Sequence, residues 1–177
     1  WHKNSKQDVL PIVEHLTGRG KNRAMTLSVQ SMSDAVQTAI ERRNMETTQL
    51  ESMFTLINSR GLNTYTELIL PLPLETAESW REGLSEVLSI GQHNSIEIWF
   101  HQLLENAEST KTHIDQYQFE YRTLPGYVSG GLEPHSENIL ENTDVVVSTN
   151  TMCYGEFLDC WQYSSMIINF HCGGWTQ

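Results

Sequence analysis

The sequence predicts an α/β fold: a partial (β/α) barrel with parallel strands, followed by an irregular, α-containing C-terminal extension. Three strand patterns, at 24–30, 64–70 and 95–100, support this prediction. They begin about 30–40 residues apart with helical patterns between them, which is typical of parallel βα units. After residue 108 the pattern loosens. We therefore expect a barrel segment over 1–108 and an extension over 109–177.

The helices between the strands have recognisable starts and apolar stripes. The clearest stripe has the i, i+3, i+4, i+7 spacing of one helix face and consists of Leu50, Met53, Phe54 and Ile57. Thr48 and Glu51 have the T-x-x-E spacing of a capping box. Other expected helix starts are Asp8, Ser33 and Thr76.

The last third of the sequence gives weaker signals. Residues 109–143 are rich in glycine and proline and predict a loop-rich region. A short strand is expected at Val145–Thr149. Residues 155–171 predict an amphipathic helix, whose core positions would be Phe157, Leu158, Trp161, Ile167 and Ile168.

Composition excludes several functional classes. The chain has 22 acidic and 11 basic residues, and its net charge of −11 makes nucleic acid an unlikely partner. No apolar run approaches the roughly 20 residues of a membrane helix, so no membrane association is expected. Three cysteines set late in the chain do not form a disulfide framework and indicate a cytoplasmic protein. A start at Trp1 and an end at Gln177 suggest an excerpt of a longer chain.

Alternation along the three strands gives each of them one apolar and one partly polar face. In the first strand Leu27 and Val29 oppose Thr26, Ser28 and Gln30. The polar faces of the next two strands carry Glu67 and, further on, Glu97, Trp99 and His101. Buried carboxylates need ligands, partners or water, so a wet cavity in the barrel would explain them. Pairing with each other, or solvation at strand ends, explains them equally well.

Three segments resemble the fourth, fifth and sixth strands of the radical S-adenosylmethionine (SAM) enzyme barrel. They are T-L-S-V-Q-S-M-S-D-A-V followed by A-I-E-R-R-N, then T-E-L-I-L-P-L-P-L-E-T-A-E-S-W, then I-E-I-W-F-H-Q-L-L-E-N-A-E. The resemblance covers roughly residues 8–108. The later region is more loosely similar to the continuation found in cobalamin-associated members.

The resemblance implies SAM and a [4Fe–4S] cluster as cofactors, with cobalamin as a further one. It also implies an electron donor such as flavodoxin or ferredoxin and a small-molecule or peptide substrate of unknown identity. In the family a C-x-x-x-C-x-x-C motif holds the cluster, and this motif is absent here. Cys153, Cys160 and Cys172 have neither its spacing nor its position, so no metal ligand is assigned in this chain.

Residue by residue, the resemblance assigns three SAM contacts. Gln30 matches a polar residue that contacts SAM, and Arg42 matches an arginine that pairs with the SAM carboxylate, with Arg43 as the neighbouring alternative. Glu67 matches an acidic residue that accepts from the ribose hydroxyls. The expected cavity lining is Ser28, Glu97, Trp99 and His101. Pro71 departs from the family, which usually has glycine there.

Two other functional classes remain open at this stage. One is a non-radical (β/α) barrel lyase or aldolase that uses the same carboxylates. The other is a degenerate, non-catalytic paralogue that binds a partner, a reading favoured by Pro71.

Overall fold

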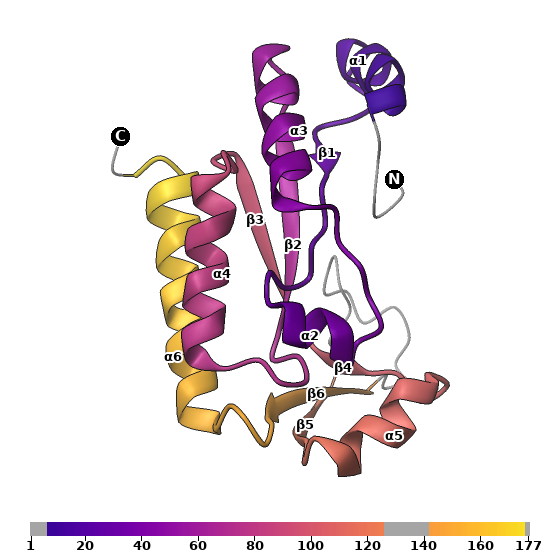
Figure 1. Cartoon of the computed structure of the whole chain (residues 1–177), viewed down its shortest axis with the longest axis vertical. Helices are drawn as coiled ribbons and strands as arrows, with labels where there is room; N and C mark the ends of the chain where they lie inside the picture. Colours follow the sequence, from indigo (N-terminus) through magenta and orange to yellow (C-terminus); the bar gives the residue numbers. More distant parts are fainter. Residues whose placement is uncertain (1–6, 126–141, 176–177) are drawn as a thin grey trace.

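The structure, a computed structural model, describes residues 7–125 and 142–175. Its helical elements are η1 (Gln7–Val9), α1 (Leu10–Gly18), α2 (Asp34–Ala39), α3 (Thr47–Ser59), α4 (Ala77–Ser89), α5 (Glu108–Gln116), α6 (Tyr154–Met166) and the π-helix η2 (Ile167–Cys172). Its strands are β1 (Met25–Thr26), β2 (Thr64–Leu70), β3 (Ser95–Phe100), β4 (Gln102–Leu103), β5 (Glu120–Pro125) and β6 (Asn142–Ser148). They form two three-stranded sheets, one parallel and one antiparallel (Figure 1).

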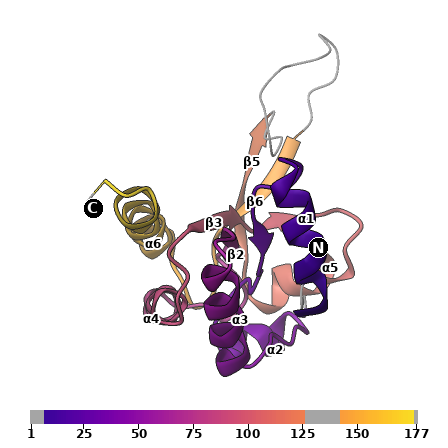
Figure 2. The ribbon, with the colours of Figure 1, turned by 90° about the horizontal axis from the view of Figure 1, so that it is seen from above.

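The first sheet has the parallel order β1-β2-β3, as the spacing of the strand patterns predicted. Helices α2 and α3 connect β1 to β2, and α4 connects β2 to β3. Helices α3, α4 and α6 lie along one side of this sheet (Figure 2). This βα arrangement confirms the predicted fold class.

The first strand is shorter than predicted and is followed by a bulge. Thr26 pairs with Tyr65, but Gln30 forms its bridge with Leu68, so this segment has one residue more than β2 over the same stretch. Such an insertion interrupts the ladder and changes the direction of the residues beyond it. The regular strand therefore ends at Thr26 instead of reaching Gln30.

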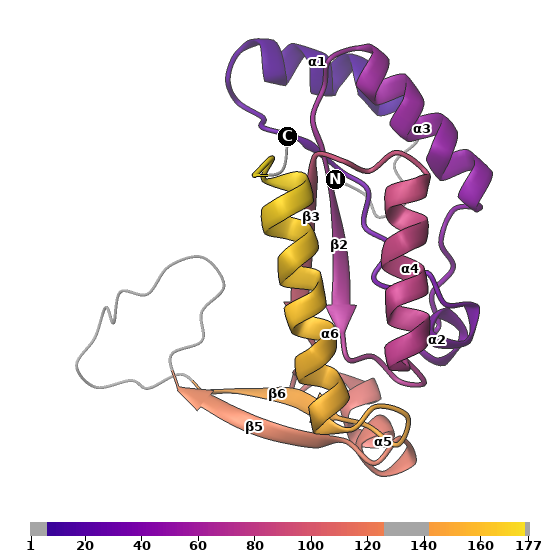
Figure 3. The same ribbon diagram turned by 90° about the vertical axis from the view of Figure 1, so that its left-hand side faces the viewer.

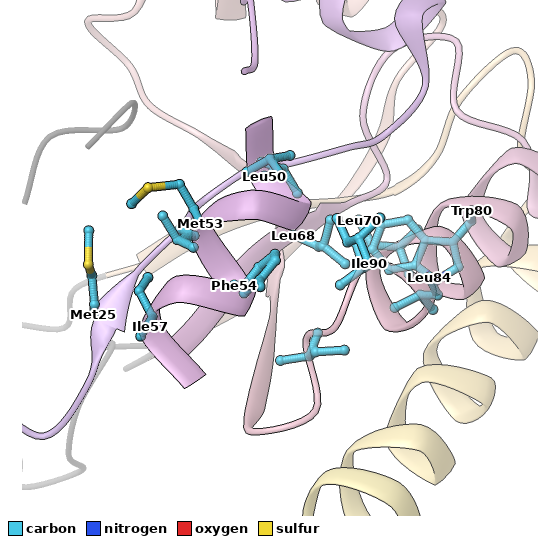
Figure 4. Close-up of a cluster of buried hydrophobic side chains, with 14 of the residues drawn as sticks. Met25, Leu50, Met53, Phe54, Ile57, Leu68, Leu70, Trp80, Leu84 and Ile90 are labelled. Atoms are coloured by element: carbon cyan, nitrogen blue, oxygen red, sulfur yellow. The ribbon is translucent and has the colours of Figure 1, made fainter. Parts of the chain in front are cut away.

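The hydrophobic core lies between the parallel sheet and its helices, as Figure 4 shows. Along β2 burial alternates strictly, with Leu68 and Leu70 buried and Glu67 half-buried. The predicted α3 stripe is buried against this face, and α4 adds Trp80, Leu84 and Val87. Each fully buried side chain of this size stabilises the fold by about 1.5–3 kcal/mol relative to exposure.

Two of the four predicted helix caps are present. The Ser33 hydroxyl accepts from the backbone N–H of Val36, and Thr76 forms a reciprocal capping box with Ser79. The predicted box of Thr48 is wrong, because α3 begins one residue earlier and Thr48 already lies inside its first turn. The predicted cap at Asp8 is also wrong, since this residue belongs to the short helix η1.

A second sheet follows, and the expectation of a loop-rich region over 109–143 is wrong for its described part. It contains α5 and β5, and β5 pairs antiparallel with β6 in a sheet of order β4-β6-β5. The side chains of β5 are largely exposed, so its sequence has no apolar alternation. Figure 3 shows this sheet beyond the carboxyl end of β2. Residues 126–141, which contain all three glycines behind that expectation, lie outside the described part.

The predicted C-terminal helix is confirmed in position, and its final turns are π-helical. Phe157 is buried as predicted, whereas Leu158 is 37% exposed and is not a core residue. Trp80 Nε1 donates to Ser164 Oγ at 2.9 Å and so ties α4 to α6. The proposed boundary at residue 108 stays a prediction. No helix within the described ranges has the length and apolar character that crossing a membrane requires.

Candidate functional site

The polar faces of the parallel strands meet at Glu67. Glu67 and Glu97 are register partners on β2 and β3, so both side chains lie on the same face of the sheet. From the other side, the Ser28 hydroxyl donates to Glu67 Oε2. The three predicted residues therefore form one row across the sheet, on the face opposite Leu68 and its apolar neighbours.

Arg42 reaches this row from the segment after α2. Its Nη2 donates to the backbone carbonyl of Ser28, and its Nε donates to Asn44 Oδ1 at 2.8 Å. Burial lowers the pKa of the Arg42 guanidinium, and the nearby charge of Glu67 opposes this effect. A guanidinium stays protonated at neutral pH. Two of its five N–H groups are used, so within the described residues three donors remain for a ligand.

Glu97, the register partner of Glu67, has a carboxyl group whose pKa is shifted. Desolvation raises the pKa of Glu97, and the neighbouring negative charge of Glu67 raises it further. Like charges on register partners disfavour simultaneous ionisation. A bound cation or a set of hydroxyl donors would relieve this repulsion.

Gln30 lies at a turn where the alternation of the strand no longer applies. Its φ is +62°, and the N–H of Ser31 donates across it to the carbonyl of Val29 at 2.8 Å. These are the features of a γ-turn with positive φ, which is rare and strained. The backbone of Gln30 is fixed to β2 on both sides, by bonds to Glu67 O and from Ile69 N. Its half-buried side chain makes no hydrogen bond to any other described residue.

His101 directly follows the carboxyl end of β3. Its N–H donates to Leu70 O at 3.0 Å, and its ring Nδ1 donates to Pro71 O at 3.0 Å. Desolvation lowers the pKa of His101 to about 4, so the imidazole is neutral near pH 7. Because Nδ1 carries the proton, Nε2 is left as an acceptor. The ring packs edge-on against Phe119, between the two sheets.

Trp99 and Pro71 complete the set of predicted positions. Trp99 is half-buried opposite Ile69 on β2. Pro71 follows β2 through a cis peptide bond with Leu70, and its carbonyl is the partner of His101. The turn at Pro71, where the resemblance leads one to expect glycine, is therefore hydrogen-bonded to His101 at the end of β3.

Glu75 is a buried carboxylate that no pattern in the sequence singled out. It is 1% exposed and accepts from Ser31 Oγ at 2.6 Å and from Ser79 Oγ. Burial raises the pKa of Glu75, and the two hydroxyl bonds oppose this shift. Its backbone carbonyl also accepts from Thr151 Oγ1 at 2.8 Å. The sequence segment P-L-P-L-E-T-A-E-S contains both partners, because its first glutamate, Glu75, accepts from its final serine, Ser79.

A cleft of about 270 Å³ lies between α2 and the start of α3. Its lining includes Arg42, Arg43 and Asn44, but not Ser28, Gln30 or Glu67. It is therefore distinct from the hollow predicted over the polar face. Among the described residues the polar face is partly exposed to solvent, since Glu97 is exposed and Glu67 is half-buried.

The three cysteines do not fit the ligand set of an iron–sulfur cluster. Burial raises the pKa of Cys160 to about 11 and also raises the pKa of Cys172, whereas cluster ligands are thiolates. Cys153 is exposed. Over residues 7–125 and 142–175, no group of three or more His, Cys, Asp or Glu side chains could hold a metal ion.

Comparison with known proteins gives two relatives that match almost the whole chain. The chain is 33% identical over 178 residues to the 2-(S-pantetheinyl)-carbapenam-3-carboxylate methyltransferase of Streptantibioticus cattleyicolor. It is 31% identical over the same length to TokK of Streptomyces tokunonensis, described as a cobalamin-dependent radical SAM methyltransferase. Each match covers 99% of this chain, which spans about a quarter (26%) of each relative. No protein-family model matches.

A solved structure has the same fold. Coproporphyrinogen III oxidase (HemN) of Escherichia coli, described as a radical SAM enzyme, matches with a TM-score of 0.54 and 17% identity. The match covers 93% of this chain and 30% of that one. The resemblance inferred from the three strand segments is thus confirmed: the chain is similar over almost its whole length to a radical SAM methyltransferase, and its fold is that of a radical SAM enzyme.

Proposed function

We propose that this chain forms part of the SAM-binding barrel of a cobalamin-dependent radical SAM methyltransferase. The polar face around Glu67 would receive SAM. The [4Fe–4S] cluster would be held by cysteines outside these 177 residues. The methyl acceptor is proposed to be a small molecule. The reasons are the relatives that match along the whole chain and the chemistry of the converging side chains.

The observation that carries this proposal is the convergence of Arg42 and Glu67 on Ser28. One group presents unused N–H donors and the other a carboxylate. SAM carries a carboxylate that a guanidinium can pair with, and ribose hydroxyls that a carboxylate can accept from. Gln30 forms its bridge with Leu68 just beyond the bulge and has a positive φ, and the family resemblance alone gives its amide a contact with SAM. The assignment of Gln30, Arg42 and Glu67 rests on this chemical match and on the family resemblance.

Bound at a reduced cluster, SAM would supply the radical chemistry of the family. The residues of this chain would bind and orient it. Arg42 would hold the amino-acid end, and Glu67 would hold the ribose. Ser28 would fix one oxygen of the Glu67 carboxylate and leave the other for the ligand. Glu97, Trp99 and His101 would line the same hollow further along the strand ends.

Binding of radiolabelled SAM to the full-length protein, with its cluster reconstituted, tests the assignment by equilibrium dialysis. Arg42→Ala and Glu67→Ala are each expected to weaken SAM binding by about tenfold or more, because a charge-assisted hydrogen bond is lost. Gln30→Ala should weaken it less, since only a neutral contact is removed. A reduced sample should release 5′-deoxyadenosine.

Matched controls separate the site from general charge effects. Arg43→Ala removes the same charge one residue away, from a side chain that is 92% exposed. Glu82→Ala removes a carboxylate from the exposed side of α4. Both should bind SAM like the parent protein. Unchanged affinity in all three site variants would remove the assignment, and an absorption spectrum without bound cobalamin after reconstitution would argue against the cobalamin-dependent class.

A further inference from the structure

The strained turn at Gln30 is held from outside by one side chain, Asn44. Both carbonyls that flank Gln30 accept from Asn44 Nδ2, Val29 O at 2.9 Å and Ser31 O at 3.0 Å. Val29 O is also the acceptor of the Ser31 N–H bond that defines the turn. Asn44 therefore holds the peptide unit before Gln30 and the one after Ser31, on either side of the positive φ.

Asn44 is also bonded directly to Arg42. Its Oδ1 accepts from Arg42 Nε at 2.8 Å, while the far end of the guanidinium donates to Ser28 O. The backbone N–H of Asn44 is in turn held by Gln37 Oε1 at 3.2 Å. One amide thus uses its oxygen for the arginine and its nitrogen for the turn, so the side chain is fully committed.

We propose that Asn44 is a positioning residue that couples the turn at Gln30 to the guanidinium of Arg42, so that both present their donors to one ligand. This proposal rests on the assignment of Gln30 and Arg42 to SAM. It adds a residue that touches neither the ligand nor the sheet face. The two contacts are separated by twelve positions in sequence, and Asn44 is the short link between them.

The chemistry of the amide makes the proposal testable with an almost isosteric change. Asn44→Asp keeps an oxygen for Arg42 and strengthens that pair through its charge. It removes both donors, however, and places a negative carboxylate oxygen against the carbonyls of Val29 and Ser31. If Asn44 served only Arg42, the aspartate would be tolerated. If it couples the two, the aspartate is as harmful as alanine.

The experiment measures the dissociation constant of radiolabelled SAM for the full-length, cluster-reconstituted protein. Asn44→Ala and Asn44→Asp are each expected to weaken binding by about tenfold. In the Arg42→Ala background, Asn44→Ala should have a clearly smaller effect, because residues that act through one another are not additive. A purely structural loss would not depend on the presence of Arg42.

The outcomes separate this inference from the assignment of the site. Parent-like affinity of Asn44→Asp, or full additivity with Arg42→Ala, would overturn the coupling while leaving the SAM site in place. Parent-like affinity of Gln30→Ala and Arg42→Ala would remove these two residues from the proposed site, and the coupling with them.

A milder variant guards against loss of folding. Gln37→Glu keeps an oxygen that accepts from the Asn44 N–H and replaces the donor to Ser31 O, at 3.3 Å, with a carboxylate oxygen. Through the loss of this long hydrogen bond and the new repulsion, it should weaken SAM binding by about two- to threefold or more. If the Asn44 variants do not fold and Gln37→Glu binds SAM like the parent, the inference is wrong.

Discussion

Replacement of Glu75 tests how the carboxyl ends of the parallel strands are held together. The carboxylate is 1% exposed and accepts hydrogen bonds from Ser31, just after the Gln30 turn, and from Ser79 in the first turn of α4. Glu75→Ala leaves both hydroxyls without their acceptor and opens a small cavity. The expected loss is about 2–4 kcal/mol of local stability.

Hydrogen–deuterium exchange of the full-length protein reports this loss where it occurs. A local destabilisation of about 2 kcal/mol speeds exchange by roughly thirtyfold. Peptides that cover residues 28–36 should show this change, whereas peptides from β5 should not. Glu82→Ala, an exposed carboxylate on the same helix α4, is the matched control. Parent-like protection of residues 28–36 in Glu75→Ala would refute the reasoning.

The pH dependence of a second variant tests the charge state of Glu75. Burial raises its pKa above the ordinary value of 4.5, so its contribution to stability is full below that value and is lost as pH rises through the folded-state pKa. Glu75→Gln does not titrate and keeps a partner for each hydroxyl. Relative to the parent it should therefore gain protection between pH 5 and pH 8. A ratio of exchange rates that stays constant over this interval would contradict the raised pKa.

Two further titratable groups give predictions of their own. His101, with a pKa lowered to about 4, should titrate well below the ordinary histidine value of 6.5 when imidazole C–H exchange is followed by mass spectrometry, and a value near 6.5 would contradict the packing described. Its protonation should cost at most about 3 kcal/mol of stability, lost as pH falls from 6.5 towards 4. Cys160, which is buried and has a pKa raised to about 11, should react with iodoacetamide at pH 8 much more slowly than the exposed Cys153, and equal rates would show that Cys160 is accessible.

The parallel sheet could be predicted because the alternation that specifies each strand lies within a few consecutive residues. In β2 the alternation of Glu67 with Leu68 and Leu70 follows the burial of the two faces residue by residue. The stripe of α3 likewise faces the core that its spacing indicates. Where burial follows a period of 2 or 3.6, sequence patterns are sufficient. The same logic brought Ser28, Glu67 and Glu97 correctly onto one face.

The missed features depend on partners that lie far away in sequence. β5 has exposed side chains and owes its conformation to pairing with β6, across residues outside the described part. Ser31 and Glu75 are 44 positions apart, so no local pattern marks their bond. The extra residue before Gln30 shifts the register by one, which alternation alone does not reveal.

Pro71 illustrates how a departure from a family pattern can be interpreted physically. A glycine at this turn would offer an N–H and close approach of the backbone, and proline removes both. What proline keeps is its carbonyl, and in this chain that oxygen accepts from His101 Nδ1. Burial keeps the imidazole neutral near pH 7 by lowering the pKa of His101 to about 4, although the bond to Pro71 O opposes that shift. The turn at Pro71 is thus hydrogen-bonded to the end of β3 through its carbonyl, while the proline offers no backbone N–H to a ligand. On the proposed assignment, ligand recognition would rest on the side chains around Glu67. The degenerate, non-catalytic alternative stays a separate hypothesis, which SAM binding by the full-length protein tests.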